Sequence, residues 1–129
     1  WNSFTGSIGC DLHLQPYLDN LCDTAHFNKQ GNRLDKFKLN DEEWVFLKSL
    51  HDLLDCFIYT TTNMSHSNMP LTHEVIPYID ELTDIMTNFH DDASINIAVQ
   101  IAAAHGQLIM NKYHSKTDDC TIYHIAMSK

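Results

Sequence analysis

The chain has 129 residues, of which 43% are hydrophobic, so it is long enough to form one domain with a hydrophobic core. Its formal net charge of -9, from 17 acidic and 8 basic residues, excludes a broadly basic surface for nucleic acid. No apolar run approaches the roughly 20 residues of a membrane-spanning helix, so no membrane partner is expected. The four cysteines are widely scattered, which favours a reducing compartment over a disulfide framework.

The N-terminal segment, residues 1–28, has the least regular apolar pattern. Its leucines and tyrosine predict a helix from about Asp11 to Asp23, with Pro16 in the first turn. Residues 29–40 are predicted to be a connecting loop. This loop contains half of the basic residues of the chain: Lys29, Arg33, Lys36 and Lys38. They are the candidate phosphate contacts, and the alternative is a solvated loop whose charge has no function.

The clearest helix begins after Asn40 in the stretch "LNDEEWVFLKSLHDLLDCFIYTTT". Asn40 is a good N-cap, and Glu43, three residues later, completes a capping-box pattern. We expect this helix to continue to the threonines at 60–62, whose β-branched side chains weaken it. Its apolar face is predicted to contain Phe46, Leu50, Leu53 and Phe57.

Two further helices follow a polar loop. The first is predicted to have a kink at Pro77 or a start near residue 74, and Pro70 suits a first turn. Its apolar residues recur at intervals of three and four: Val75, Ile79, Leu82, Met86 and Phe89. The second is predicted to begin at Asp92 or Ser94. Its expected core-facing stripe contains Ala98, Ile101, Ala102, His105, Leu108, Ile109 and Tyr113, with His105 as a core histidine.

This spacing predicts an all-α fold, in which residues 41–129 form a bundle of long amphipathic helices. The most suggestive metal-binding pattern is Cys10, His13, Cys22 and His26. If residues 11–23 are helical, however, the two cysteines are about 18 Å apart and cannot share one ion. Asp80 and Asp84 on one helix resemble a carboxylate cluster, but they equally suit the wet side of an amphipathic helix. No convincing catalytic set is present.

The order of motifs resembles the hAT superfamily of DNA transposases, in which a large helical insertion interrupts an RNase H-like catalytic domain. The resemblance covers nearly all of the chain. It begins with "WNSF" and continues through these landmarks: Glu42-Glu43-Trp44, Phe57 to Thr61, Ser65, Pro70-Leu71 and Lys112-Tyr113. The family's arginine before the tryptophan lies outside the sequence, and Phe4 stands where the family often has threonine.

The resemblance implies that the chain is a fragment of a larger transposase, or of a domesticated derivative, and acts in the nucleus as a scaffold. Trp1 would match the family tryptophan that handles the cleaved DNA end, with packing in the core as the alternative. The catalytic carboxylates, which use Mg²⁺ or Mn²⁺, would lie outside this segment, so the fragment is expected to be inactive. Expected partners are transposon-end DNA, bound by the parent protein, and further copies of the chain in a homo-oligomer. The alternative function is a transposon-derived protein-interaction module, which the acidic surface favours.

Overall fold

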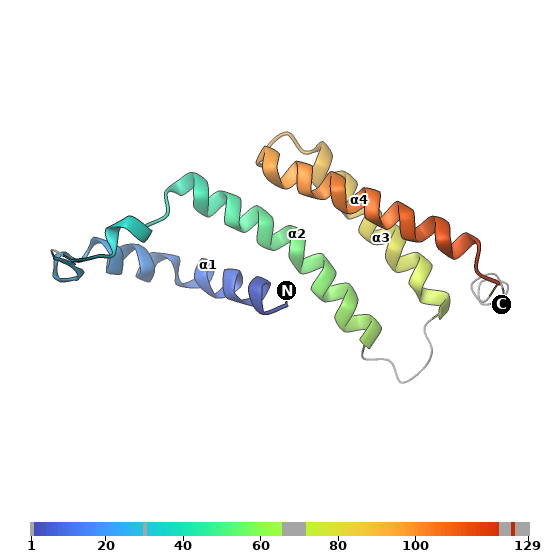
Figure 1. The fold of residues 1–129 in the computed structure, drawn as a ribbon, viewed down its shortest axis with the longest axis horizontal. Helices are drawn as coiled ribbons and strands as arrows, with labels where there is room; N and C mark the ends of the chain where they lie inside the picture. Colours follow the sequence, from blue (N-terminus) through green and yellow to red (C-terminus); the bar gives the residue numbers. More distant parts are fainter. Residues whose placement is uncertain (1, 30, 66–71, 122–124, 126–129) are drawn as a thin grey trace. The chain divides into compact units, whose positions relative to one another are not determined.

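The computed structural model describes residues 2–29, 31–65, 72–121 and 125. Its long helices are α1 (Asn2–Asp23), α2 (Asp41–Ser65), α3 (Thr72–Asp91) and α4 (Ile97–Asp118) (Figure 1). Between α1 and α2 lie two short 3₁₀ turns, η1 (Ala25–Phe27) and η2 (Asp35–Phe37), and two strands, β1 (Asn28–Lys29) and β2 (Asn32–Arg33). The described part is therefore all-α apart from one small hairpin, which confirms the predicted fold class.

The chain divides into two compact units, Trp1–His51 and Asp52–Lys129, and each is described by itself. In the first unit, α1 begins at Asn2, nine residues earlier than predicted, so Pro16 lies inside the helix. The early turns are the packed part of α1, since Thr5 and Ile8 are buried there. A Cβ atom on Gly9 would lie 2.9 Å from Nε2 of His51. Tertiary contacts thus stabilise a glycine-containing segment that local propensity does not favour.

The first turn of α2 contains the predicted capping box. The backbone N–H of Glu43 donates to Oδ1 of Asn40, and the backbone N–H of Asn40 donates to the Glu43 carboxylate, both at 2.8 Å. These bonds satisfy two backbone donors that a helix start otherwise leaves unpaired. The next residue, Trp44, is buried.

The C-terminal end of α2 lies beyond the predicted threonines. The Thr60 hydroxyl donates to the carbonyl of Cys56 at 2.9 Å, and the Thr61 hydroxyl donates to the carbonyl of Phe57 at 2.7 Å. Each hydroxyl is thus satisfied within the helix by the carbonyl four residues earlier. Because the threonines do not need an external partner, α2 continues to Ser65.

In the second unit, α3 and α4 form an antiparallel hairpin. The Gln107 amide donates to the Thr87 hydroxyl at 2.8 Å, and His114 Nε2 lies 3.3 Å from a carboxylate oxygen of Asp80. Residue numbers therefore rise along one helix as they fall along the other. Leu82 and Met86 are buried, as predicted for α3, and Pro77 lies exposed inside the helix.

The structure reverses the predicted orientation of α4. The side that packs on α3 contains Val99 and Ala103, which are 1% and 0% exposed, and Gly106, where an added Cβ atom would lie 3.1 Å from Sδ of Met86. The whole predicted stripe is exposed instead: Ala98, Ile101, Ala102, His105, Leu108, Ile109 and Tyr113. His105 is therefore not a core histidine. A small residue suits position 106 because Met86 fills the space next to it.

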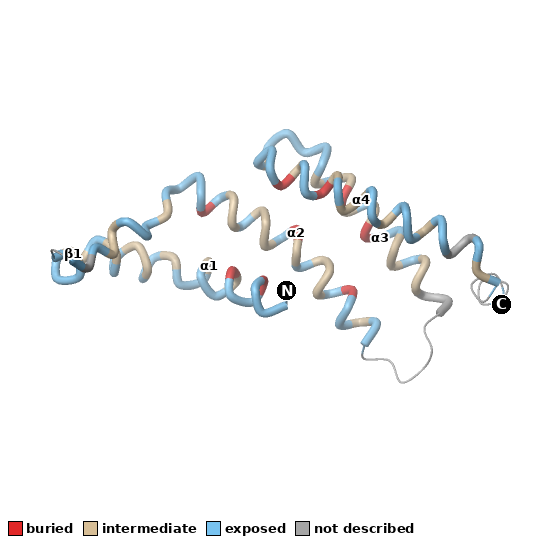
Figure 2. Tube along the Cα trace, in the orientation of Figure 1, coloured by how far each residue is buried: buried red, intermediate tan, exposed pale blue. Residues whose placement is uncertain are grey.

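The start of α4 also differs from the prediction. Asp92 lies before the helix, where its carboxylate accepts bonds from the Ser94 backbone N–H at 2.8 Å and hydroxyl at 2.6 Å. Asn96 is the N-cap, since its side-chain oxygen accepts from the Ala98 N–H at 2.9 Å. The polar residues from 92 to 96 thus form a turn and a cap, and α4 begins at Ile97. Figure 2 shows that most of α4 is exposed and that its buried positions lie in its first half.

Replacement of Asn40 by alanine should lower the free energy of unfolding by about 1 kcal/mol, because it removes the Oδ1 atom that accepts the hydrogen bond from the Glu43 backbone N–H. Urea unfolding followed by circular dichroism measures the change. Asn20→Ala is the control, because Asn20 is exposed in the interior of α1. Equal stabilities for Asn40→Ala and the unmodified chain would show that the cap contributes nothing.

Candidate nucleic-acid interface

A hollow of about 460 Å³ lies in the first unit, between the end of α1 and the start of α2. Its walls come from η1, the hairpin and η2, and they combine basic and aromatic side chains: His26, Phe27, Lys29, Arg33, Lys36 and Phe37. Gly31 and Leu34 complete the lining. Three of the four predicted basic residues therefore surround one site.

The Asn28 side chain connects the segments that form this hollow. Its Nδ2 donates to the carbonyls of Cys22 at 2.6 Å and Thr24 at 3.3 Å, at the end of α1. Its Oδ1 accepts from the backbone N–H of Asp35 at 2.9 Å, at the start of η2. The predicted connecting loop is thus a structured element, because one side chain satisfies three backbone groups.

A tight turn reverses the chain inside the hollow. β1 and β2 pair antiparallel, with Asn28 opposite Arg33. Gly31 has a φ of 106°, a conformation that side-chain-bearing residues rarely adopt. The turn brings Lys29 and Arg33, which are four residues apart in the sequence, to the same hollow.

The four predicted cations differ in how far they are neutralised. Arg33 donates to both carboxylate oxygens of Asp35, at 3.3 and 2.6 Å, and this guanidinium keeps the pKa of Asp35 below its usual value. Lys38 donates to Asp23 at 2.6 Å, which raises the pKa of Lys38, and it does not line the hollow. Among the described residues, Lys29 and Lys36 have no carboxylate partner. Their charges are the ones available to an anion.

Aromatic side chains complete the site, and they were not among the predicted contacts. Phe37 is 66% exposed, and the Lys36 ammonium lies 4.8 Å from the centre of its ring. His26 and Phe27 meet edge to face at 5.3 Å. Cations beside exposed rings can bind phosphates, and the rings can stack bases. The alternation of aromatic and basic residues in "HFNKQGNRLDKFK" is the signal that would have identified these rings.

Trp1, the remaining predicted DNA contact, lies outside the described residues. Cys10 and Cys22, the two cysteines of the possible zinc-binding pattern, lie at distant positions of one helix, as predicted, because α1 includes both of them. The acidic residues of α3 are exposed, which agrees with the solvent-facing side of an amphipathic helix: Asp80, Glu81 and Asp84. No cluster of potential metal ligands occurs within the described ranges.

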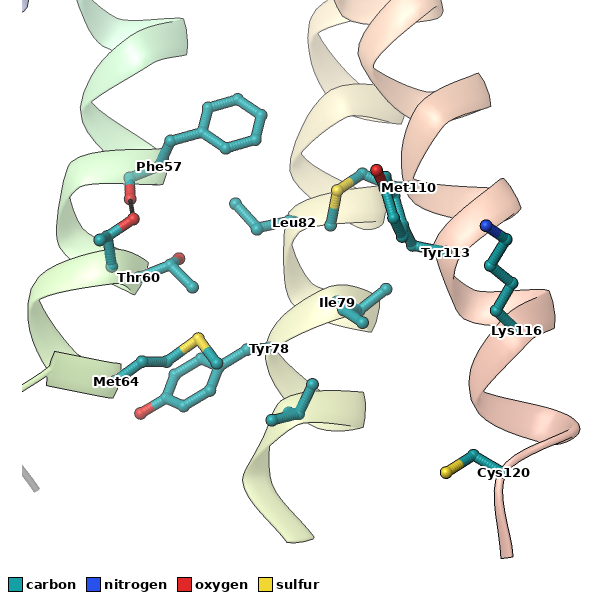
Figure 3. A pocket seen from close by; sticks show the side chains of 12 residues that line it. Phe57, Thr60, Met64, Tyr78, Ile79, Leu82, Met110, Tyr113, Lys116 and Cys120 are labelled. Carbon is teal, nitrogen blue, oxygen red and sulfur yellow. Dashed lines mark hydrogen bonds between the residues drawn. The ribbon is translucent and has the colours of Figure 1, made fainter. Parts of the chain in front are cut away.

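A second hollow, of about 560 Å³, lies in the second unit among α2, α3 and α4 (Figure 3). Its walls are mainly apolar and include Phe57, Leu82 and Met110, with Lys116 over the Tyr113 ring at 5.6 Å. Its polar lining residues include Tyr78 and Cys120.

The Cys56 thiol is a poor nucleophile. Burial raises its pKa to about 11, and its Sγ donates to the carbonyl of Leu53 at 2.8 Å. A thiol with this pKa is almost entirely protonated at neutral pH, and the thiolate is the reactive form.

Alkylation by iodoacetamide at pH 8 should therefore label the exposed Cys10 well before Cys56. Mass spectrometry of peptides taken over a time course measures the two rates. The rate at Cys56 should continue to rise up to about pH 11. Labelling of Cys56 that is as fast as that of Cys10 at pH 8 would contradict this assignment.

Within the described part, no helix is both long and apolar enough to cross a membrane. Comparison of the chain with protein-family models, with curated proteins and with solved structures finds no match. The hollow around Lys29 and Lys36 therefore has to be interpreted from its own chemistry.

Proposed function

We propose that the chain is a non-catalytic helical segment of a hAT-like DNA transposase, or of a domesticated derivative, and that it contacts DNA through the basic hollow. The observation that carries this proposal is the meeting of Lys29, Arg33 and Lys36 with exposed rings in a chain of net charge -9. An acidic chain repels phosphate over most of its surface, so a local basic site is where a backbone phosphate would bind.

The chemistry of the hollow suits a single strand or an unpaired DNA end. Lys29 and Lys36 supply charges without a carboxylate partner among the described residues, and the ring of Phe37 is open to solvent. A base can stack on such a ring only when it is not enclosed in a duplex. Arg33 is paired with Asp35, so its part would be to shape the site and to contribute bonds if that pair opens.

Strand cleavage would belong to other parts of the parent protein. The exposed acids of α3 lie on a solvated helix side, and Asp80 is beside His114. The parent's carboxylates would bind Mg²⁺ or Mn²⁺ and activate water and the 3′-hydroxyl in the nucleus. The role of this segment would be to separate those carboxylates in the sequence and to present a wall to the DNA end.

A protein-interaction module is the second candidate, and one observation favours it. The exposed side of α4 carries Ile97, Leu108 and Ile109, each more than half exposed. Large exposed apolar side chains on one side of a helix are typical of a protein interface. Absence of DNA binding at low salt, together with capture of a protein by this side of α4, would favour this function.

Binding of a fluorescein-labelled DNA hairpin with a single-stranded tail should depend on the hollow. Lys36→Gln should reduce the slope of log affinity against log salt by about 0.7, the value for one phosphate of a single strand. Phe37→Ala should weaken binding by about 1–3 kcal/mol, the contribution of one stacked base. Fluorescence anisotropy over a series of salt concentrations measures both effects.

Two matched variants control for charge and ring removal. Lys48 is exposed on α2 and does not line the hollow, so Lys48→Gln should leave the slope unchanged. Phe4 is 58% exposed on α1, so Phe4→Ala should leave the affinity unchanged. If Lys36→Gln and Phe37→Ala behave like these controls, the hollow is not the DNA site. Trp1→Ala, measured in the same way, tests the contact implied by the family resemblance.

The 129-residue chain, incubated with Mg²⁺ or Mn²⁺, should neither nick nor join the hairpin, since the proposal places the metal-binding carboxylates outside it. Denaturing gel electrophoresis of labelled DNA measures the products. Replacement of both Asp80 and Asp84 by asparagine is the control for a contaminating nuclease, because a contaminant would still cleave the DNA in a preparation of this variant. Cleavage that requires the chain and is abolished in this variant would overturn the non-catalytic assignment.

A further inference from the structure

The cations of the basic hollow outnumber the carboxylates that neutralise them. The lining contains three cationic side chains, Lys29, Arg33 and Lys36, and no acidic residue. Arg33 is neutralised by Asp35, since its guanidinium donates to both carboxylate oxygens. Neither lysine has such a partner within the part of the chain that the structure describes. The hollow therefore keeps two positive charges for a ligand.

The acidic residues of this segment do not cancel the two remaining charges. Between residues 22 and 39 the sequence contains two acids, Asp23 and Asp35. A carboxylate oxygen of Asp23 lies 2.6 Å from the ammonium of Lys38, and one of Asp35 lies 2.6 Å from the guanidinium of Arg33. Each acid is thus held by another cation, and the two lysines of the hollow stay available to an anion.

The hollow has the size and the rings for one nucleotide. Its volume of about 460 Å³ lies within the range of small-molecule sites, roughly 300–1,000 Å³. Phe37 is 66% exposed and Phe27 is 42% exposed, so much of each ring is open to a base. The Lys36 ammonium lies 4.8 Å from the centre of the Phe37 ring. A base on this ring therefore has a positive charge close to its phosphate.

We propose that the basic hollow takes the phosphorylated terminus of a single strand, a refinement that rests on the proposed contact with DNA. The terminal base stacks on Phe37, and the terminal phosphate lies against Lys29 and Lys36. An internal phosphodiester has one negative charge, whereas a phosphomonoester has a charge of about −1.5 to −2 at neutral pH. The monoester matches both lysines at a single phosphorus atom. The hollow thereby distinguishes the end of a strand from its middle.

Three thymidine strands that differ only at the 5′ end test this preference. They carry a 5′-phosphate, the methyl ester of that phosphate, or a 5′-hydroxyl, with fluorescein at the 3′ end for anisotropy measurements. The phosphorylated strand should bind the 129-residue chain at least about fivefold more tightly than the hydroxyl strand, because it adds a close charge pair. The methyl ester should lose most of this gain, because it keeps the phosphate and removes one charge.

A second set of strands, modified in the same way at the 3′ end and labelled at the 5′ end, tests the other terminus. A gain in affinity from the monoester at either end supports the proposal and shows which terminus is taken. Absence of a gain at both ends would overturn it.

Charge removal tests whether the gain arises in the hollow. Lys29→Gln and Lys36→Gln should each reduce the gain, and the two changes in one chain should remove it. Lys48→Gln is the matched control, because it removes the same charge from an exposed position of α2 outside the hollow. Circular dichroism should show unchanged helix content in all of these variants. A gain that persists in the double variant would mean that the phosphate binds elsewhere, and the proposal would be wrong.

Competition distinguishes a nucleotide from its phosphate alone. At constant ionic strength, thymidine 5′-monophosphate should displace the phosphorylated strand at a lower concentration than inorganic phosphate, because only the nucleotide can stack on Phe37. Phe37→Ala should remove this difference. Equal displacement by the two competitors with the unmodified chain would contradict stacking of the terminal base.

Failure of this inference is distinguishable from failure of the proposed function. If all strands bind equally and all lose affinity in Lys36→Gln and Phe37→Ala, the hollow contacts DNA without recognising its end. If the affinity of no strand depends on these two residues, the hollow is not the DNA site, and both proposals are wrong.

Discussion

The close packing of α3 against α4 is the contact on which the second unit depends. Met86 is 1% exposed and lies against Gly106, where any side chain would compete for the same space. This contact favours a small residue at position 106, because an added Cβ atom would require the Met86 side chain to shift. The large apolar residues Ile97, Leu108 and Ile109 lie on the exposed side of α4.

The first unit obtains its candidate site from a different kind of contact. Asn28 hydrogen-bonds to the end of α1 and to the start of η2, and so fixes a short segment that has little apolar burial. Such segments are commonly where binding residues lie, because they are positioned by a scaffold and remain accessible. The acidic residues Asp23 and Asp35 neutralise two of the cations. What remains is a small site with two available lysines, which suits contact with one or two phosphates better than wrapping of a duplex.

Much of the fold could be predicted from the sequence, because helix signals are local. The Asn40–Glu43 capping box and the apolar spacing of α3 both depend on residues within a few turns of one another. The orientation of α4 could not be predicted in this way, since its two sides are both apolar and the choice depends on Met86 in another helix. The extent of α1 was missed for a similar reason, because contacts at Thr5 and Gly9 stabilise turns that have weak local propensity.

For the candidate site, the basic residues were found from charge alone. Their grouping required the turn at Gly31 and the bonds of Asn28, and separation of Lys38 from the group required its pairing with Asp23.

The most direct test of this account compares two truncations, one of a side chain buried between α3 and α4 and one of a side chain on the exposed side of α4. Urea unfolding of Met86→Ala and Leu108→Ala should be measured at a concentration low enough for the chain to be monomeric. Met86→Ala should cost about 2–5 kcal/mol, as for a buried side chain, and Leu108→Ala should change stability by less than about 0.5 kcal/mol. A large loss for Leu108→Ala with a small one for Met86→Ala would show that α4 packs through its other side, and the described packing of α3 on α4 would be wrong.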